Sequence, residues 1–193
     1  MQSAYSNNKN SGDLNMLLRT LSSIDRNQVV ELFKQVFTDA HGADAGLALK
    51  QLVRQLVDAS MTADVMGYGA LDDEKLSGAI FFSRLKFDDP HQVYMLSPVA
   101  VSTARQKRGL GQRVIRHGLE QLRSHGADLV VTYGDPAYYG RFGFEPLSQV
   151  QIRAPHPLTM PDGWLGLALN DQPVPSIAGT PSCVAAFNDQ SLW

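Results

Sequence analysis

The chain has 193 residues, of which 44% are apolar, and a net charge of −2 at pH 7. These values fit one domain with a sizeable core and argue against a general nucleic-acid-binding protein. No apolar run approaches the ~20 residues of a membrane span, and the polar N-terminus lacks a secretory signal. The single cysteine, Cys183, excludes an internal disulfide framework. The sequence therefore predicts a cytoplasmic protein with no membrane or nucleic-acid partner.

The N-terminal third of the chain predicts a disordered extension, a short edge strand and two helices. Residues 1–15 are mostly polar, so we expect an extension without a fixed structure. Residues 17–21 are predicted to form an edge strand, and Ser22, Ser23 and Asp25 offer a helix cap. Apolar residues then recur at helical spacing within 29–37 and again within 49–57.

The middle of the chain predicts a hairpin followed by a third strand. Residues 65–71 and 76–87 have the pattern of two strands around a turn at 72–75. The third strand begins at Gln92 and contains Pro98, which has no backbone N–H to donate to a neighbour. This strand must therefore be bulged or unpaired at Pro98.

A basic turn at 103–111 and a helix follow that strand. Apolar side chains and one glycine recur at helical spacing, namely Leu110, Val114, Ile115, Gly118, Leu119 and Leu122. Gly126 stands where a left-handed residue commonly ends a helix. The apolar, β-branched run at 128–133 then predicts a buried strand.

The composition of the basic turn suits an anionic ligand. Gly109 and Gly111 have no Cβ, so a ligand can approach the backbone closely. The first N–H groups of the following helix have no partner within it and point out of its positive end. Six of the chain's 17 lysines and arginines lie in or just after the turn: Arg105, Lys107, Arg108, Arg113, Arg116 and Arg123. These features predict a phosphate or pyrophosphate site.

Three phosphate-binding motifs are compared at this turn. A P-loop would require Gly-Lys-Ser/Thr, whereas Gly111 is followed by Gln112. A dinucleotide fingerprint would require a small residue in place of Val114. The third pattern, Gln/Arg-x-x-Gly-x-Gly/Ala, is met in full by Gln106, Gly109 and Gly111.

A second motif lies after the predicted strand at 128–133. Residues 134–144 read GDPAYYGRFGF, which contains Tyr139 and ends in Gly143 and Phe144. The two motifs, in this order, resemble the GNAT superfamily of acyl-CoA-dependent N-acetyltransferases. The wording of the second motif, together with LSPVAV at 96–101, resembles the YhbS-like bacterial branch of that superfamily.

This resemblance implies an α/β (α+β) fold of the GNAT type. We expect a mixed, mostly antiparallel twisted sheet of about seven strands, with a V-shaped splay between two parallel strands and about four helices. The GNAT core would span residues 16–150, and residues 151–193 would complete the same domain. Within that last segment, residues 164–169 and 183–187 are predicted to form short strands.

The resemblance also implies acetyl-CoA as co-substrate, without a metal. It assigns the coenzyme to Val99, Ala100, Val101, Gln106, Lys107, Arg108, Gly109, Leu110, Gly111, Gln112, Asp135 and Tyr139. The acceptor would be a primary amine of a small molecule or a peptide, acetylated by direct attack in a ternary complex. The resemblance also implies that the two helices predicted around 29–37 and 49–57, with their connection, lie over the acceptor side of the cleft. A homodimer is a common assembly among similar proteins.

Two residues receive catalytic roles through the resemblance. The backbone N–H of Val99 would donate to the oxyanion. Tyr139 would act as general acid toward the departing thiolate, since an unperturbed phenol titrates near ~10 and a thiol near ~8.5. Cys183 lies in an apolar segment, where a structural thiol is expected rather than an acetyl-enzyme nucleophile.

Two questions stay open from the sequence. Glu31, Asp39, His41 and Glu145 are candidate general bases by location alone, and a water chain would also serve. The alternative function is a CoA-binding sensor that has kept the fold and lost turnover. The intact Tyr139 favours the enzyme.

Overall fold

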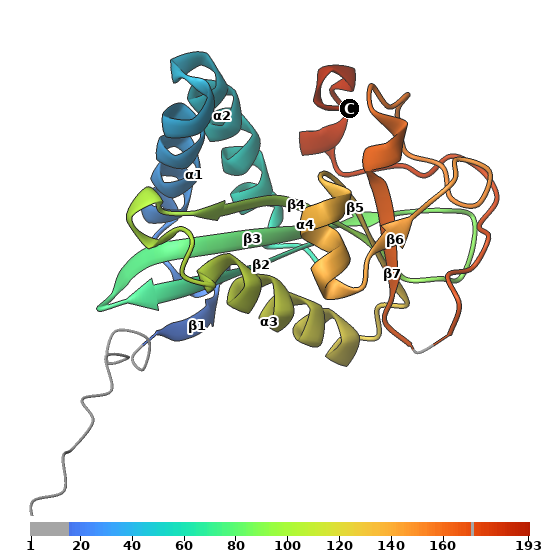
Figure 1. The fold of residues 1–193 in the computed structure, drawn as a ribbon, viewed down its shortest axis with the longest axis horizontal. Coiled ribbons are helices and arrows are strands. Elements are labelled where there is room, and N and C mark those ends of the chain that lie inside the picture. The colour runs from blue at the N-terminus through green and yellow to red at the C-terminus, as the bar shows by residue number, and fades with distance from the viewer. Residues whose placement is uncertain (1–15, 171) are drawn as a thin grey trace, which may run out of the picture.

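A single mixed sheet forms the centre of the protein (Figure 1). The computed structural model describes residues 16–170 and 172–193, so the prediction for residues 1–15 lies outside the described residues. Within these ranges, seven strands follow the order β1-β2-β3-β4-β5-β7-β6. Their bounds are β1 (Leu17–Thr20), β2 (Val65–Asp72), β3 (Lys75–Leu85), β4 (Val93–Val101), β5 (Leu129–Tyr133), β6 (Glu145–Pro146) and β7 (Trp164–Ala168). Only β4 and β5 pair in parallel among these strands, which confirms the predicted mixed, mostly antiparallel sheet.

Helices cover both faces of this sheet. The α-helices are α1 (Arg26–His41), α2 (Ala43–Ala59), α3 (Leu110–Ser124) and α4 (Pro136–Tyr139). Short 3-10 helices are η1 (Leu21–Ser23), η2 (Thr103–Arg105), η3 (Gly140–Phe142), η4 (Pro161–Gly163), η5 (Ala185–Phe187) and η6 (Gln190–Leu192). In Figure 1, α1 and α2 stand on one side of the sheet and α3 runs along the other. None of the helices in the described ranges is long and apolar enough to cross a membrane.

The ends of α1 and α3 follow their sequence signals. The Asp25 carboxylate caps α1 by accepting hydrogen bonds from the backbone N–H groups of Asn27 and Gln28, at 2.9 and 3.0 Å. Gly126, just past the end of α3, has φ of 78°, which confirms the predicted left-handed residue.

Helix α3 packs against the sheet through the face that its periodicity predicts. The buried positions of the helix are Leu110, Val114, Ile115, Gly118, Leu119 and Leu122, in agreement with the sequence pattern. A glycine is required at one of them, because a Cβ on Gly118 would lie 2.4 Å from Cε2 of Phe82 on β3. The close approach of helix to sheet therefore depends on this glycine.

The predicted hairpin is also confirmed. Strands β2 and β3 pair antiparallel and are joined by Asp73 and Glu74. Both residues have positive φ, 46° and 66°, as a tight two-residue turn between twisted strands requires.

Strand β4 changes its partner along its length. It pairs in parallel with β5 from Val93 to Leu96 only, and from Val99 to Val101 it pairs with β3 alone. The register of β3 against β4 shifts between Ile80 and Phe82, opposite the segment that contains Pro98. The predicted bulge is therefore present, and none of the described strands lies beside the edge of β4 beyond Leu96 on the β5 side.

The C-terminal segment packs on the same face of the sheet as α1 and α2. Trp164 on β7 and Trp193 are buried in the core that α1 and α2 also enter. The prediction of a strand at 183–187 is wrong, because residues Ala185–Phe187 form the 3-10 helix η5. A short apolar run is typical of any buried segment, and here the carbonyl of Phe187 bonds Trp193 Nε1 at 3.0 Å rather than a neighbouring strand.

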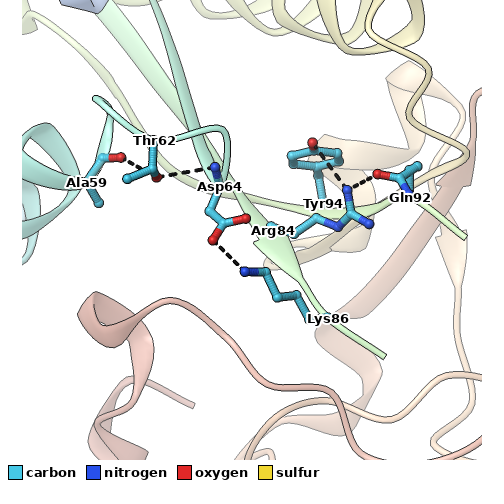
Figure 2. A network of polar contacts seen from close by, with 7 residues as sticks. All are labelled: Ala59, Thr62, Asp64, Arg84, Lys86, Gln92 and Tyr94. Atoms are coloured by element: carbon cyan, nitrogen blue, oxygen red, sulfur yellow. Dashed lines mark hydrogen bonds and ion pairs between the residues drawn. The ribbon is translucent and has the colours of Figure 1, made fainter. Parts of the chain in front are cut away.

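The opposite end of β4 is held by polar side chains (Figure 2). The Arg84 guanidinium on β3 donates to the Gln92 side chain and lies over the Tyr94 ring, 5.2 Å from its centroid. Lys86 pairs with Asp64 at 2.6 Å, which ties β3 to the segment that leads from α2 into β2. These contacts lie at the end of β4 opposite its free edge, and they hold β3 against the start of β4 and the segment before β2.

Candidate active site

The turn between β4 and α3 presents the N-terminus of α3 to solvent. Gly109 precedes the helix with φ of 80°, a left-handed conformation that favours glycine. A Cβ on Gly111, in the first turn of the helix, would lie 3.0 Å from the Tyr138 hydroxyl and 3.4 Å from Cγ2 of Val101. Gly109 is therefore required for its backbone conformation, whereas Gly111 is required because there is little room for a side chain.

Three side-chain contacts hold this turn in place. Gln106 Nε2 donates to the carbonyl of Val101 at 3.1 Å. The Thr103 hydroxyl donates to the Asp39 carboxylate on α1 at 2.6 Å. Arg105 forms an ion pair with Asp72 at the end of β2. The turn is thus connected to β4, α1 and the β2–β3 hairpin, which orients the helix N-terminus before any ligand arrives.

A cleft of about 740 Å³ begins at this turn. It is lined by Val36, Phe37, Ala40, His41, Val99, Ala100, Val101, Arg105, Gln106, Lys107, Gly109, Leu110, Gly111, Gln112, Asp135, Tyr138, Tyr139 and Arg141. The residues predicted to bind the coenzyme are brought together here, with one exception. Arg108 does not line the cleft and faces a smaller cavity beside Met16 and Arg113.

The resemblance placed the first two helices over the acceptor side of the cleft, but sequence reasoning did not identify which of their residues line it. Val36, Phe37 and Ala40 belong to α1, far from both motifs in the chain. Their helical periodicity predicts an inward face, but it cannot indicate that part of this face borders a cleft. Arg141 lies inside the second motif, so the motif itself was a signal for it; its guanidinium lies 5.8 Å from the Tyr138 ring centroid.

Tyr139 lies at the base of the cleft in an apolar setting. Its ring covers Gly134, where a Cβ would approach Cε2 of the ring to 2.6 Å. The rings of Tyr138 and Phe144 lie edge-on to it, with centroids at 5.1 and 5.7 Å. Burial raises the pKa of Tyr139 to about 12, although a hydrogen bond with Thr132 partly offsets this effect. The phenol is therefore a weaker acid than the unperturbed group that the sequence suggested.

The charges that line the cleft are mostly positive. Arg105, Lys107 and Arg141 line it, and Asp135 is the one carboxylate among the described lining residues. Asp135 also caps α4, accepting a hydrogen bond from the backbone N–H of Ala137 at 2.9 Å. This balance suits a ligand that carries several negative charges.

The four candidate bases have different surroundings. Glu31 lies in a separate groove on the other side of α1, where a hydrogen bond from Lys50 lowers its pKa. Asp39 is occupied by Thr103 and by Gln35, whose Nε2 donates to it at 2.7 Å. Glu145 is on β6, outside the cleft lining, whereas His41 lines the cleft at the end of α1.

Comparison with known proteins supports this reading of the cleft. The family described as "Acetyltransferase (GNAT) domain" matches residues 18–147. The N-acetyltransferase YhbS of Escherichia coli K12 is 32% identical over 146 residues, covering 75% of this chain and 82% of YhbS. The N-acetyltransferase YjhQ of the same organism is 33% identical over 129 residues, covering 64% of this chain and 71% of YjhQ.

Solved structures of related proteins share the fold. The crystal structure of E. coli YhbS in complex with CoA superposes with a TM-score of 0.76 at 26% identity, covering 90% of this chain and 92% of that one. A GNAT acetyltransferase from Brucella melitensis in complex with acetyl-CoA gives a TM-score of 0.60 at 28% identity, with 90% and 98% covered. The extent of the family match, the relatives in the predicted branch and the splayed sheet all agree: this chain belongs to the GNAT family of acetyltransferases.

Proposed function

We propose that the protein transfers the acetyl group of acetyl-CoA to a primary amine of a small molecule or a peptide, by direct attack in a ternary complex. The observation that carries this proposal is the continuity of one cleft. It joins the N-terminus of α3, the unpaired edge of β4 at Val99–Val101, and Tyr139. The CoA and acetyl-CoA complexes of the E. coli and Brucella relatives support the choice of coenzyme.

The residues of the cleft fit the parts of acetyl-CoA. The backbone N–H groups from Lys107 to Gly111 would hold the pyrophosphate, since they lie at a helix N-terminus. Arg105, Lys107 and Arg141 would balance its negative charge. Val99 and Val101, whose backbone groups point to the free side of β4, would hydrogen-bond the pantetheine. Ala100, whose backbone groups face β3, would contact it as a small residue of the cleft wall. The bound coenzyme supplies a thioester, whose carbonyl carbon is the electrophile.

The protein would then stabilise charge and move protons around that carbonyl. The backbone N–H of Val99, just past the bulge, is proposed as the oxyanion donor. The C–N bond forms as the C–S bond breaks, so the amine loses one proton and the sulfur gains one. We propose His41 as acceptor of the amine proton, because it is the one of the four candidate bases that lines the cleft.

Tyr139 is proposed to act on the departing sulfur. Moving a proton completely from a phenol with a pKa of about 12 to a thiolate with a pKa near ~8.5 costs ~5 kcal/mol. Tyr139 would therefore act chiefly as a hydrogen-bond donor to the thiolate. Water would protonate the thiolate as CoA leaves, which supplies the proton that the sulfur gains.

Thiol release from acetyl-CoA, measured against a panel of amines, tests this function. Tyr139→Phe should lower kcat by roughly 100-fold, because it removes a donor aimed at developing charge. Tyr94→Phe is the matched control: it makes the same chemical change at the far end of β4, where the hydroxyl has only a 3.5 Å contact with Arg84. Binding of CoA without thiol release across the panel would favour the sensor instead.

A further inference from the structure

The wall of the cleft formed by α1 is mostly apolar. Val36 is buried and Phe37 is half-buried, whereas Ala40 and His41 are exposed to the cleft. The Phe37 and His41 rings lie close together, with centroids 5.9 Å apart. This side of the cleft therefore offers apolar contact area and one imidazole ring.

The same cleft offers little to a second positive charge. Among the described lining residues the single carboxylate is that of Asp135, which already caps α4, and the α1 side of the lining contributes none. The acidic residues Glu31, Asp73 and Glu74 line a separate groove beside α1, outside this cleft. There, Glu31 is paired with Lys50 at 2.8 Å and with Lys34 at 3.3 Å. A second positive charge on the α1 side of the cleft would thus lose hydration without a lining carboxylate beside it.

We propose that the acceptor, which the resemblance puts on the α1 side of the cleft, carries one ionisable nitrogen on an apolar body. An alkylamine or arylalkylamine fits this description, whereas a polyamine or an aminoglycoside does not. The proposal rests on the acetyl transfer proposed above. It adds that the wall of Val36, Phe37 and Ala40 selects the acceptor by burying apolar area.

A matched pair of substrates tests the class of acceptor. Hexylamine and 1,6-diaminohexane have the same chain and differ in one terminal ammonium group. We expect kcat/KM for hexylamine to exceed that for the diamine by at least tenfold. Within the series ethylamine, butylamine and hexylamine, kcat/KM should rise by up to about fourfold for each methylene that is buried. A diamine that reacts as well as or better than hexylamine would overturn the proposal.

A charge placed on the wall should change this preference. Ala40→Glu puts a carboxylate on an exposed cleft residue, so the ratio of hexylamine to diamine activity should fall at least fivefold. Asn27→Glu adds the same charge to the exposed first turn of the same helix, outside the cleft, and should leave the ratio unchanged. An unchanged ratio in Ala40→Glu would remove the wall from the acceptor site.

Binding measurements separate this inference from the proposed function. Calorimetric titration with CoA comes first, because a protein that does not bind CoA refutes the acetyl-transfer proposal itself. If CoA binds and no amine is acetylated, the two amines are titrated into the CoA complex. Tighter binding of hexylamine supports the acceptor class, and equal, reversed or undetectable binding of the pair refutes it.

Discussion

The substitution Gly111→Glu tests the assignment of the pyrophosphate to the N-terminus of α3. The new side chain would begin at a Cβ that lies 3.0 Å from the Tyr138 hydroxyl and 3.4 Å from Val101, inside the cleft. A carboxylate roughly 5 Å from a phosphate, at an effective dielectric constant of about 20, is repelled by ~3 kcal/mol. We therefore expect CoA to bind roughly 100-fold more weakly.

Two companion variants separate charge from volume. Gly111→Ala adds only the Cβ, and the hydroxyl that it meets is the end of a side chain that can shift, so the loss of CoA affinity should stay below roughly tenfold. Gln121→Glu adds the same charge near the C-terminal end of α3, outside the cleft lining, and should not change CoA affinity.

Isothermal titration calorimetry with CoA, at low and at high salt, measures these effects. The loss in Gly111→Glu should shrink at high salt, because ions screen the repulsion where the site is open to solvent. An affinity in Gly111→Glu within threefold of the unsubstituted protein, with the fold intact by circular dichroism, would refute the placement of the pyrophosphate.

Two further predictions concern stability. Burial raises the pKa of Tyr139 to about 12, so the folded state holds this proton more tightly than the unfolded state, and the resulting stability is complete below pH ~10 and lost as pH rises toward 12. Between pH 10 and 12, the unfolding free energy of the unsubstituted protein should therefore fall by up to ~2.7 kcal/mol more than that of Tyr139→Phe. Urea titrations of both proteins across this pH range measure the difference, and parallel pH profiles would contradict the raised pKa. Gly118→Ala should destabilise by ~1–3 kcal/mol, because the Cβ would meet the buried Phe82 ring at 2.4 Å, whereas Gly140→Ala, with nothing within 4 Å, should be neutral or slightly stabilising. Thermal or urea unfolding checks this pair, and equal stabilities would show that α3 can move away from the sheet at little cost.

Helix α3 shows which features a local sequence pattern can predict. The apolar face from Leu110 to Leu122 and the left-handed Gly126 were predictable, because helical periodicity and a positive φ are properties of neighbouring residues. The bulge at Pro98 was predictable for a similar reason, since a missing N–H is a property of the residue itself.

The wrong prediction at residues 183–187 shows what a local sequence pattern cannot predict. An apolar run indicates burial but not the element that is buried, and Ala186 and Phe187 fill the core from a 3-10 helix. The position of Arg108 was equally ambiguous: it lies within the basic turn, yet it lines a smaller cavity, whereas Lys107 lines the cleft.

The two motifs, the helical faces and hence the family could be predicted from sequence, because each depends on residues that lie close together in the chain. Three features required the folded structure: which residues of α1 line the cleft, the hydrogen bond by which Asp39 holds the turn through Thr103, and the partly buried setting of the Tyr139 phenol. These features arise from contacts between segments far apart in sequence, and the acidity of a side chain depends on everything that surrounds it.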